Sequence, residues 1–412
     1  MAQRPPDSSL SAVGWARRLA RHLLSRGQEV LVSWVFLVAD RFLSVRDDYW
    51  CFCTWPWYPH TLDNPRAVFE EVRGDADITK IILQRHQGPL PTGEPTKVIA
   101  VPAESWRGAV FLARSRVVVL GYSMIMMASY SKLLRRPRHQ VVQLLHGVPL
   151  KRVGRLSGAA GYWEAETLHY AAVPSSSPRD AEIHREAFAP VPHTWLTGLP
   201  RNDLILKPEA ELPTDYQRQL ADLDTRLRGR RLVLYAPTWR ADPGELRGFT
   251  AAQEKTLSGL MQRHNGVLGI RAHPNARRHQ VYAELEESEV ILDLTDLPEA
   301  NLILRRAQVL VTDYSSIYID FLLLDRPVLH FAYDMNSYQS TRGLLYRPEE
   351  AFGGPCLTTF EDLIEALETV LVNPAAHQAE RAAATRLFHA HPGASAQAVA
   401  GLIRQLVVSP GG

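Results

Sequence analysis

The sequence predicts an α/β protein with two doubly wound domains that face each other across a cleft. Short runs rich in β-branched and aromatic residues alternate with segments of helical spacing, and such alternation is typical of parallel sheets with helices on both faces. The 412 residues are enough for two domains of this kind. Proline, acidic and polar residues cluster after Arg201, which indicates a domain boundary near residue 205.

The elements of each domain follow from hydrophobic runs and the polar turns between them. In the first domain, residues 46–205, strands are expected at 49–55, 78–83, 97–101, 116–122 and 140–146, with helices at 64–72 and 123–134. In the second domain, residues 206–405, strands are expected at 231–239, 266–274, 290–295, 308–316 and 326–334, each followed by a polar turn and a helix.

Residues 1–45 form a basic amphipathic segment ahead of the first domain. Four arginines between residues 17 and 26 interleave with Trp15, Leu19 and Leu23 and lead into the apolar run 30–39. That run is about half of the roughly 20 residues needed to cross a bilayer, and the segment lacks the features of a secretory signal. Two interpretations stay open: the helix lies in a membrane interface, or it packs on the first domain and exposes its arginines.

The charge and the cysteine content indicate which kinds of ligand and structural site the chain can have. The formal net charge of +2 hides a basic stretch that should attract anions. Between residues 131 and 156 there is no acidic residue, and the basic ones are Lys132, Arg135, Arg136, Arg138, Lys151, Arg152 and Arg155. Three cysteines are too few for a disulfide framework. We expect no cofactor, no nucleic-acid partner and no dedicated metal site, because the acidic residues expected near the ligand do not cluster as magnesium ligands do.

Polar residues gather directly after several expected strands. Ligands of open parallel sheets bind at the carboxyl ends of the strands, so these residues should share one rim. The motifs are HGVPLKR at 146–152, TGLPRND at 197–203, APTWR at 236–240, RAHPN at 271–275 and TDYSS at 312–316. The side chains suited to oxyanions are His146, Lys151, Arg152, Arg201, Arg240, Arg271 and His273.

The TDYSS motif joins an apolar strand to a helix. Ser315 and Ser316 fall at the expected helix N-terminus, where unpaired backbone N–H groups favour a phosphate. The alternative is that a serine there only caps the helix. Asp313 is expected to accept hydrogen bonds from loop amides or from a ligand hydroxyl. The sequence contains neither GxxxxGK[ST] nor GxGxxG, which excludes the commonest phosphate loops.

In this order the five motifs resemble the signature series of the CDP-glycerol glycerophosphotransferase family, which builds teichoic acids and related capsule polymers. The resemblance covers about residues 48 to 370. It implies a GT-B arrangement with an acceptor-side first domain, a nucleotide-side second domain and a cleft between them. The chain reads LHGVPLK where the family pattern is WHGTPLK, so Val148 replaces a threonine, and Leu199 replaces the aromatic residue of GYPRND. Both departures bear on the choice of acceptor.

The resemblance implies that an acceptor hydroxyl attacks the alcohol-bearing phosphorus of a CDP-linked polyol, glycerol first among the candidates, and expels CMP. Positioning and charge stabilisation supply most of the catalysis in such a displacement. His146 is the expected base and His273 the expected acid or hydrogen-bond donor to the phosphates. The alternatives are that His146 caps a tight turn and that His273 is a buried structural histidine.

The remaining site assignments rest on the same resemblance. Ser315, Ser316, Arg271 and Arg342 are assigned to the donor phosphates, and Lys151, Arg152, Arg201 and Arg240 to the acceptor or phosphates. Arg201 or Arg240 could instead form an interdomain salt bridge. Asp203, Asp313 and Asp320 are assigned supporting roles.

The expected acceptor is a lipid-linked saccharide or polyol phosphate, and the expected location is cytoplasmic, on the inner face of the cell membrane. Two other functions stay open. The first is a sugar-nucleotide glycosyltransferase of GT-B architecture, against which the paired HGxPLK and PRND motifs argue. The second is a non-catalytic membrane-associated subunit, against which His146 and His273 argue.

Overall fold

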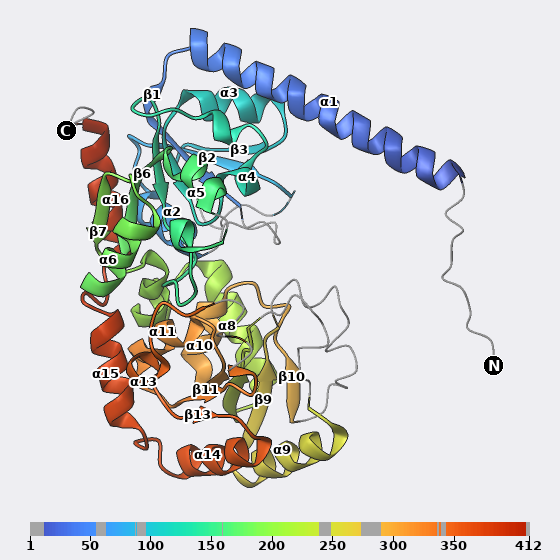
Figure 1. The fold of residues 1–412 in the computed structure, drawn as a ribbon, viewed down its shortest axis with the longest axis vertical. Coiled ribbons are helices and arrows are strands. Elements are labelled where there is room, and N and C mark those ends of the chain that lie inside the picture. The colour runs from blue at the N-terminus through green and yellow to red at the C-terminus, as the bar shows by residue number, and fades with distance from the viewer. Residues whose placement is uncertain are drawn as a thin grey trace.

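The computed structural model describes residues 12–54, 63–86, 88, 96–158, 160–238, 249–272, 290–335, 338 and 343–408, and in the first helix it describes side chains from residue 27 onward. Two parallel sheets lie one above the other, each with helices on both faces (Figure 1). The expected α/β class with two doubly wound domains is confirmed.

The first sheet has seven strands in the order β3-β2-β1-β4-β5-β6-β7. Every neighbouring pair is parallel, and the order reverses between β1 and β4. The strands are β1 Arg46–Cys53, β2 Thr79–Gln84, β3 Val98–Pro102, β4 Ser115–Leu120, β5 Gln140–Gln143, β6 Tyr170–Ser175 and β7 His193–Leu196. The helices of this half are α2 Asp63–Val72, α3 Trp106–Arg114, α4 Met124–Met127, α5 Ala160–Thr167 and α6 Pro178–Ala187.

The second sheet has six strands in the order β10-β9-β8-β11-β12-β13, all pairs again parallel. Its strands are β8 Arg231–Tyr235, β9 Gly266–Ile270, β10 Ile291–Asp293, β11 Ala307–Thr312, β12 Val328–Phe331 and β13 Cys356–Leu357. Its helices are α7 Asp203–Leu206, α8 Thr214–Leu227, α9 Ala251–Arg263, α10 Ala300–Arg306, α11 Ile317–Phe321, α13 Pro348–Ala351, α14 Phe360–Val372 and α15 Gln378–Phe388.

The structure departs from the expected elements in a few places. Strands β6, β7 and β13 were not expected, since β7 and β13 are short and β6 contains Pro174. The helix expected at 123–134 reduces to α4 and a 3-10 turn. Ser131 explains the interruption, because its hydroxyl donates to the carbonyls of Met124 and Ala128 and so replaces bonds of a helical ladder.

Helix α1 spans Ala12–Phe42 and extends away from the body at its N-terminal end (Figure 1). Its C-terminal half packs on the first domain, with Val32, Phe36 and Ala39 buried in the same core cluster as residues of α3. Asp40 accepts from Arg138 at 2.6 Å and lies 3.0 Å from the Nε2 of His139. In the described part of the chain, no helix combines the length and the apolar character that a membrane span needs.

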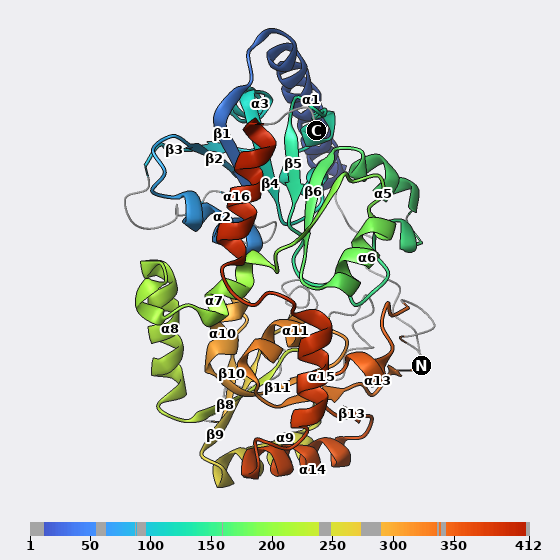
Figure 2. The same cartoon turned by 90° about the vertical axis from the view of Figure 1, so that its left-hand side faces the viewer.

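The last helix, α16 Ser395–Val408, returns to the first domain. Figure 2 shows it running beside the first sheet, far from α14 and α9. Val399, Ala400 and Ile403 share one core cluster with strand β1, and the carboxylate of Asp203 accepts from the N–H groups of Ser395 and Ala396 at 3.0 and 2.9 Å. The expected second domain of residues 206–405 therefore has to be corrected at its end. The apolar spacing of 395–405 gives a helix, but it carries no information about which sheet that helix covers.

Candidate functional site at the domain junction

The turn that carries His146 follows β5 and is held by side chains from other segments. Asn64 Nδ2 donates to the carbonyls of Leu144 and Leu145 at 3.2 and 2.9 Å, and Arg201 Nη1 donates to the carbonyl of His146 at 2.6 Å. Leu145 has a φ of 57° and Gly147 a φ of 143°. Such backbone persists where the surroundings fix it, and it is frequent at functional sites.

The ring of His146 is exposed at this turn. It stacks on Tyr122, with 4.8 Å between ring centroids and 13° between the planes. Tyr122 follows β4, so the histidine lies at the carboxyl edge of the sheet, where ligands of this fold bind. An exposed imidazole whose ring stacks on a tyrosine is suited to proton transfer with a bound hydroxyl.

The serines of the TDYSS motif lie across the junction from this turn. Ser316 precedes α11 but makes no capping hydrogen bond, and Ser315 Oγ only reaches the N–H of Ile317 at 3.5 Å. A Cβ placed on Gly147 would lie 2.8 Å from Ser316 Oγ, so the two segments are in contact. The structure therefore brings the His146 turn of the first domain against Ser316 of the second.

The basic residues after the turn also reach the second domain. Lys151 forms an antiparallel bridge with Leu344, and its Nζ lies 5.5 Å from the ring centroid of Tyr338. Tyr338 in turn stacks on Tyr314 of the TDYSS motif at 4.0 Å. Arg152 is exposed, and its side chain lies against Gly343. Both cations thus lie beside segments of the second domain.

Arg201 is buried at the junction and forms ion pairs from both sides. Its guanidinium lies 3.2 Å from Asp63 of α2 and 2.5 Å from Asp320 of α11. Burial raises the pKa of Asp320 to about 6, although Arg201 opposes the shift; burial also raises the pKa of Asp63 and of Glu299. This is the interdomain salt bridge of the alternative interpretation, and it differs from the expected contact with acceptor or phosphate.

Arg271 and the supporting aspartates hold loops. Arg271 Nη1 donates to the carbonyls of Leu294 and Leu297 at 3.3 and 2.5 Å, and its Nη2 donates to that of Pro298 at 3.1 Å. These carbonyls accept from both Nη atoms, so Arg271 holds the 294–298 loop. Asp313 accepts from the amides of Thr238 and Tyr314 at 2.8 and 2.6 Å, the loop role expected for it. Asp203 caps α16, as described above, and Asp320 pairs with Arg201.

Three expected site residues, Arg240, His273 and Arg342, lie outside the described residues. Sequence reasoning missed three others at the junction: Asp63, Asn64 and Glu299. The signal was present for the first two, since Asp-Asn-Pro at 63–65 opens a helix on the same rim. Glu299 gave no such signal, because its side-chain partners outside its own helix cap are Asp63 N at 3.0 Å and Tyr216 Oη at 3.2 Å, both distant in sequence.

A second set of serine, histidine and aspartate lies beneath the next strand. Ser175 Oγ is 2.7 Å from His184 Nδ1, and His184 Nε2 is 3.2 Å from Asp180 Oδ1. All three side chains are buried, with His184 only 1% exposed, and burial lowers the pKa of His184. These contacts fasten β6 to α6, and a substrate has no access to them.

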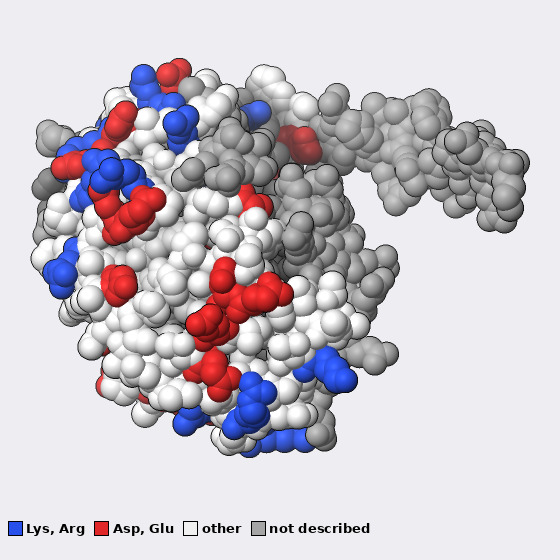
Figure 3. Space-filling model, turned by 60° about the horizontal axis from the view of Figure 1, so that its bottom comes forward, with Lys and Arg blue, Asp and Glu red and all other residues white. Residues whose placement is uncertain are grey.

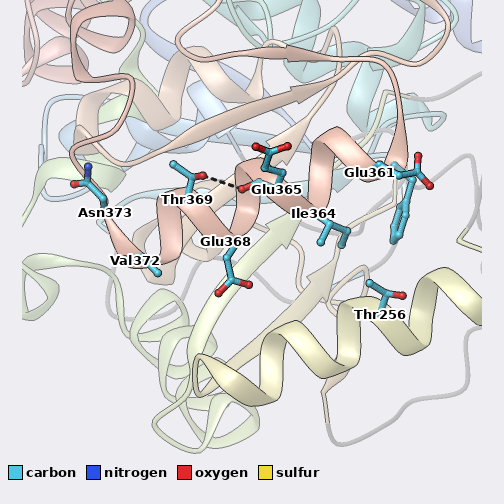
Figure 4. A pocket seen from close by; sticks show the side chains of 9 residues that line it. Thr256, Glu361, Ile364, Glu365, Glu368, Thr369, Val372 and Asn373 are labelled. Carbon is cyan, nitrogen blue, oxygen red and sulfur yellow. Dashed lines mark hydrogen bonds between the residues drawn. The ribbon is translucent and has the colours of Figure 1, made fainter.

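A hollow of about 810 Å³ lies between α9 and α14 on the side of the second domain away from the junction. Phe360, Ile364 and Val372 supply apolar surface, while Glu361, Glu365 and Glu368 supply carboxylates (Figure 4). Figure 3 looks onto the bottom of the molecule, where acidic side chains gather in the middle of the face. Like charges repel, so a phosphorylated ligand is not expected in this hollow.

Two proteins of known name are similar in sequence to this chain. A Staphylococcus aureus protein named teichoic acid ribitol-phosphate polymerase is 27% identical over 57% of this chain and 46% of its own length. A teichoic acid glycerol-phosphate transferase from the same species is 26% identical over 75% of this chain and 80% of its own length. The chain therefore spans less than half of the first relative and four-fifths of the second.

Among solved structures, the wall teichoic acid polymerase TagF superposes with a TM-score of 0.75 at 21% identity, covering 97% of this chain and 99% of that one. The fold is thus the expected GT-B arrangement. A sequence model of CDP-glycerol:poly(glycerophosphate) glycerophosphotransferases matches residues 36–405. The chain therefore belongs to the CDP-glycerol:poly(glycerophosphate) glycerophosphotransferase family.

Proposed function

We propose that this protein transfers a polyol phosphate, with glycerol phosphate the first candidate, from a CDP-linked donor to an acceptor hydroxyl and releases CMP. The acceptor is a lipid-linked saccharide or polyol phosphate in the synthesis of a teichoic-acid-like or capsule polymer. The observation that carries the proposal is the contact between the His146 turn and Ser316 across the domain junction. Family membership supports the class of donor and the class of reaction.

In the proposed reaction the acceptor oxygen forms a bond to the phosphorus of the polyol phosphate. The bond from that phosphorus to the bridging oxygen breaks, and CMP leaves with the bond's electron pair. His146 takes the proton of the attacking hydroxyl, and its exposed ring at the sheet edge supports this role. Positioning of donor and acceptor supplies much of the rate.

The second domain is proposed to hold the donor phosphates. The hydroxyls of Ser315 and Ser316 are half-buried beside the His146 turn, and Lys151 and Arg152 lie near the same junction. His273, Arg240 and Arg342 stay in the proposed phosphate set on sequence grounds. Arg201 is left out of that set, because carboxylates and a carbonyl occupy its Nη atoms.

The donor and the reaction class are tested by CMP release from CDP-glycerol, CDP-ribitol and UDP-sugars, with the lipid-linked acceptor present. We expect turnover of one CDP-polyol and its loss in the His146→Ala and His273→Ala variants. His264→Ala is the matched control, since His264 pairs with Glu368 far from the junction. Turnover of only a UDP-sugar would favour the sugar-nucleotide alternative. Activity indifferent to both site histidines would contradict the proposed site.

We also propose that α1 rests on the inner face of the cell membrane. Val30, Leu31, Trp34, Leu37 and Val38 are between 42 and 64% exposed and lie on the side of the helix opposite its buried face. Lys132 lines a hollow of about 230 Å³ beside Trp34 and Leu37. An apolar stripe next to a lysine suits an anionic lipid surface.

Flotation with phosphatidylglycerol vesicles tests this contact. The Leu31→Glu/Trp34→Glu double variant should lose most of its binding, because it places two carboxylates on the apolar stripe. Val372→Glu is the control, since Val372 is equally apolar and exposed but lies on α14. Unchanged flotation of the double variant would remove the membrane proposal and leave the reaction untouched.

A further inference from the structure

Three buried carboxylates surround one buried guanidinium directly beneath the His146 turn. Asp63 belongs to α2 of the first domain, Glu299 caps α10 and Asp320 lies in α11 of the second domain, and all are less than 5% exposed. Arg201 lies in the segment between the domains. Taking such charges out of water costs free energy. The cluster is therefore expected to have a role besides joining the two domains.

Arg201 of this cluster is hydrogen-bonded to the backbone of the His146 turn. Arg201 Nη1 donates to the carbonyl of His146 at 2.6 Å, and Asn64 holds the two preceding carbonyls. The two side chains are coupled, because Arg201 N donates to Asn64 Oδ1 at 2.9 Å. From the second domain, Asn301 Nδ2 donates to the carbonyl of Arg201 at 3.0 Å. The guanidinium is therefore fixed from both domains and in turn fixes the residue that carries the ring.

The packing around Gly147 shows how close this contact is. A Cβ at Gly147 would lie 2.8 Å from Arg201 Nη2 and 2.8 Å from Ser316 Oγ. Only glycine fits between these two groups. A shift of the guanidinium would thus move the turn relative to Ser316.

We propose that Arg201 is a positioning residue, which Asp63 and Asp320 clamp between the domains and which fixes the His146 ring opposite Ser316 through the carbonyl of His146. The inference rests on the proposed function for the role of His146 as base. Misplacement of a reacting group by about 1 Å can cost on the order of 10²-fold in rate. Arg201 therefore acts on the rate of chemistry through the turn, without touching the donor.

A phosphate-binding role for Arg201 predicts a different result. Three carboxylates within the same buried cluster would repel a phosphate oxygen, and one carbonyl and two carboxylates occupy its Nη atoms. Arg201 Nε is buried and has no hydrogen-bond partner among the described residues. A phosphate ligand should govern donor affinity, whereas a positioning residue should govern kcat.

The test uses the full chain with Arg201→Gln, Arg201→Lys and Asp320→Asn. It measures kcat and KM for CMP release, the Kd of CDP-glycerol by calorimetry, and the imidazole NMR signal of His146 assigned with His146→Ala. Arg381→Gln is the matched control, because Arg381 is also buried and donates to the carbonyls of Pro374 and Ala376 away from the junction.

We expect Arg201→Gln to lower kcat about 10²-fold, to leave the Kd of CDP-glycerol within threefold and to move the His146 signal. Asp320→Asn, which keeps Arg201 and the turn, should give a smaller change in the same direction. If Arg201→Gln does not fold, Asp320→Asn and Arg201→Lys together provide the test. Arg381→Gln should leave kcat per folded molecule and the His146 signal unchanged.

Two results would overturn the inference. One is a Kd of CDP-glycerol raised tenfold or more with kcat unchanged, which would make Arg201 a phosphate ligand. The other is a His146 signal that stays in place in all three variants. Failure of the proposed function is separate: if His146→Ala keeps full activity, His146 is not the base. Even then, a moved His146 signal supports positioning by Arg201, and an unmoved one refutes it.

Discussion

Two histidines of the first domain, His146 and His184, differ in their exposure to solvent. His146 follows β5, is exposed at the sheet edge and belongs to a turn that contacts Ser316 of the other domain. His184, beneath the adjacent strand β6, has a serine at 2.7 Å and an aspartate at 3.2 Å, but all three are buried. Residue types alone would favour the second set as a nucleophilic triad. Access to a ligand and an opposing domain therefore decide which histidine can do chemistry.

Apart from removal of the His146 ring itself, filling the space beside His146 is expected to give the largest effect. Gly147→Ala should lower CMP release about 10²-fold or more, because its Cβ would strike Arg201 and Ser316 and its φ of 143° suits glycine alone. The control is Gly229→Ala, where φ is also positive but nothing lies within 4 Å of the new Cβ. Equal activity of the two variants would mean that contact at the junction does not matter for the reaction.

Buried histidines should affect the free energy of unfolding, and His330 gives the clearest case. Burial lowers its pKa to about 4, so between pH 6.5 and 4 the unfolded chain binds a proton that the folded chain does not. The free energy of unfolding should therefore fall as the pH drops through this window, by about 3 kcal/mol from this group. Urea unfolding of wild type and His330→Phe at several pH values checks this. Identical pH dependence in both proteins would refute it.

The buried triad is expected to give a smaller effect of the same kind. His184→Ala leaves Ser175 and Asp180 without their partner and should cost about 2 kcal/mol of unfolding free energy. Chemical denaturation measures that loss. CMP release per folded molecule should stay within twofold of wild type, and a much larger fall would show that the cluster takes part in the reaction.

Much of the fold and part of the site could be predicted from the sequence. Apolar runs and polar turns predicted ten of the strands. They also predicted that the motifs of His146, Lys151 and Ser316 follow strands whose carboxyl ends share one edge. The partners of Arg201 and Arg271 could not be predicted, since a cationic side chain looks the same in sequence whether carboxylates, carbonyls or phosphates surround it. Long-range contacts such as Asp63 with Glu299 and α16 with β1 likewise leave no local pattern.

The most direct test of the account compares CMP release from CDP-glycerol by His146→Ala and by His184→Ala, each normalised to folded protein. We expect the first variant to lose on the order of 10³-fold in kcat, the range for removal of a general base, and the second to stay within twofold of wild type. Near-normal turnover by His146→Ala, or a larger loss in His184→Ala, would contradict the assignment of the chemistry to the domain junction.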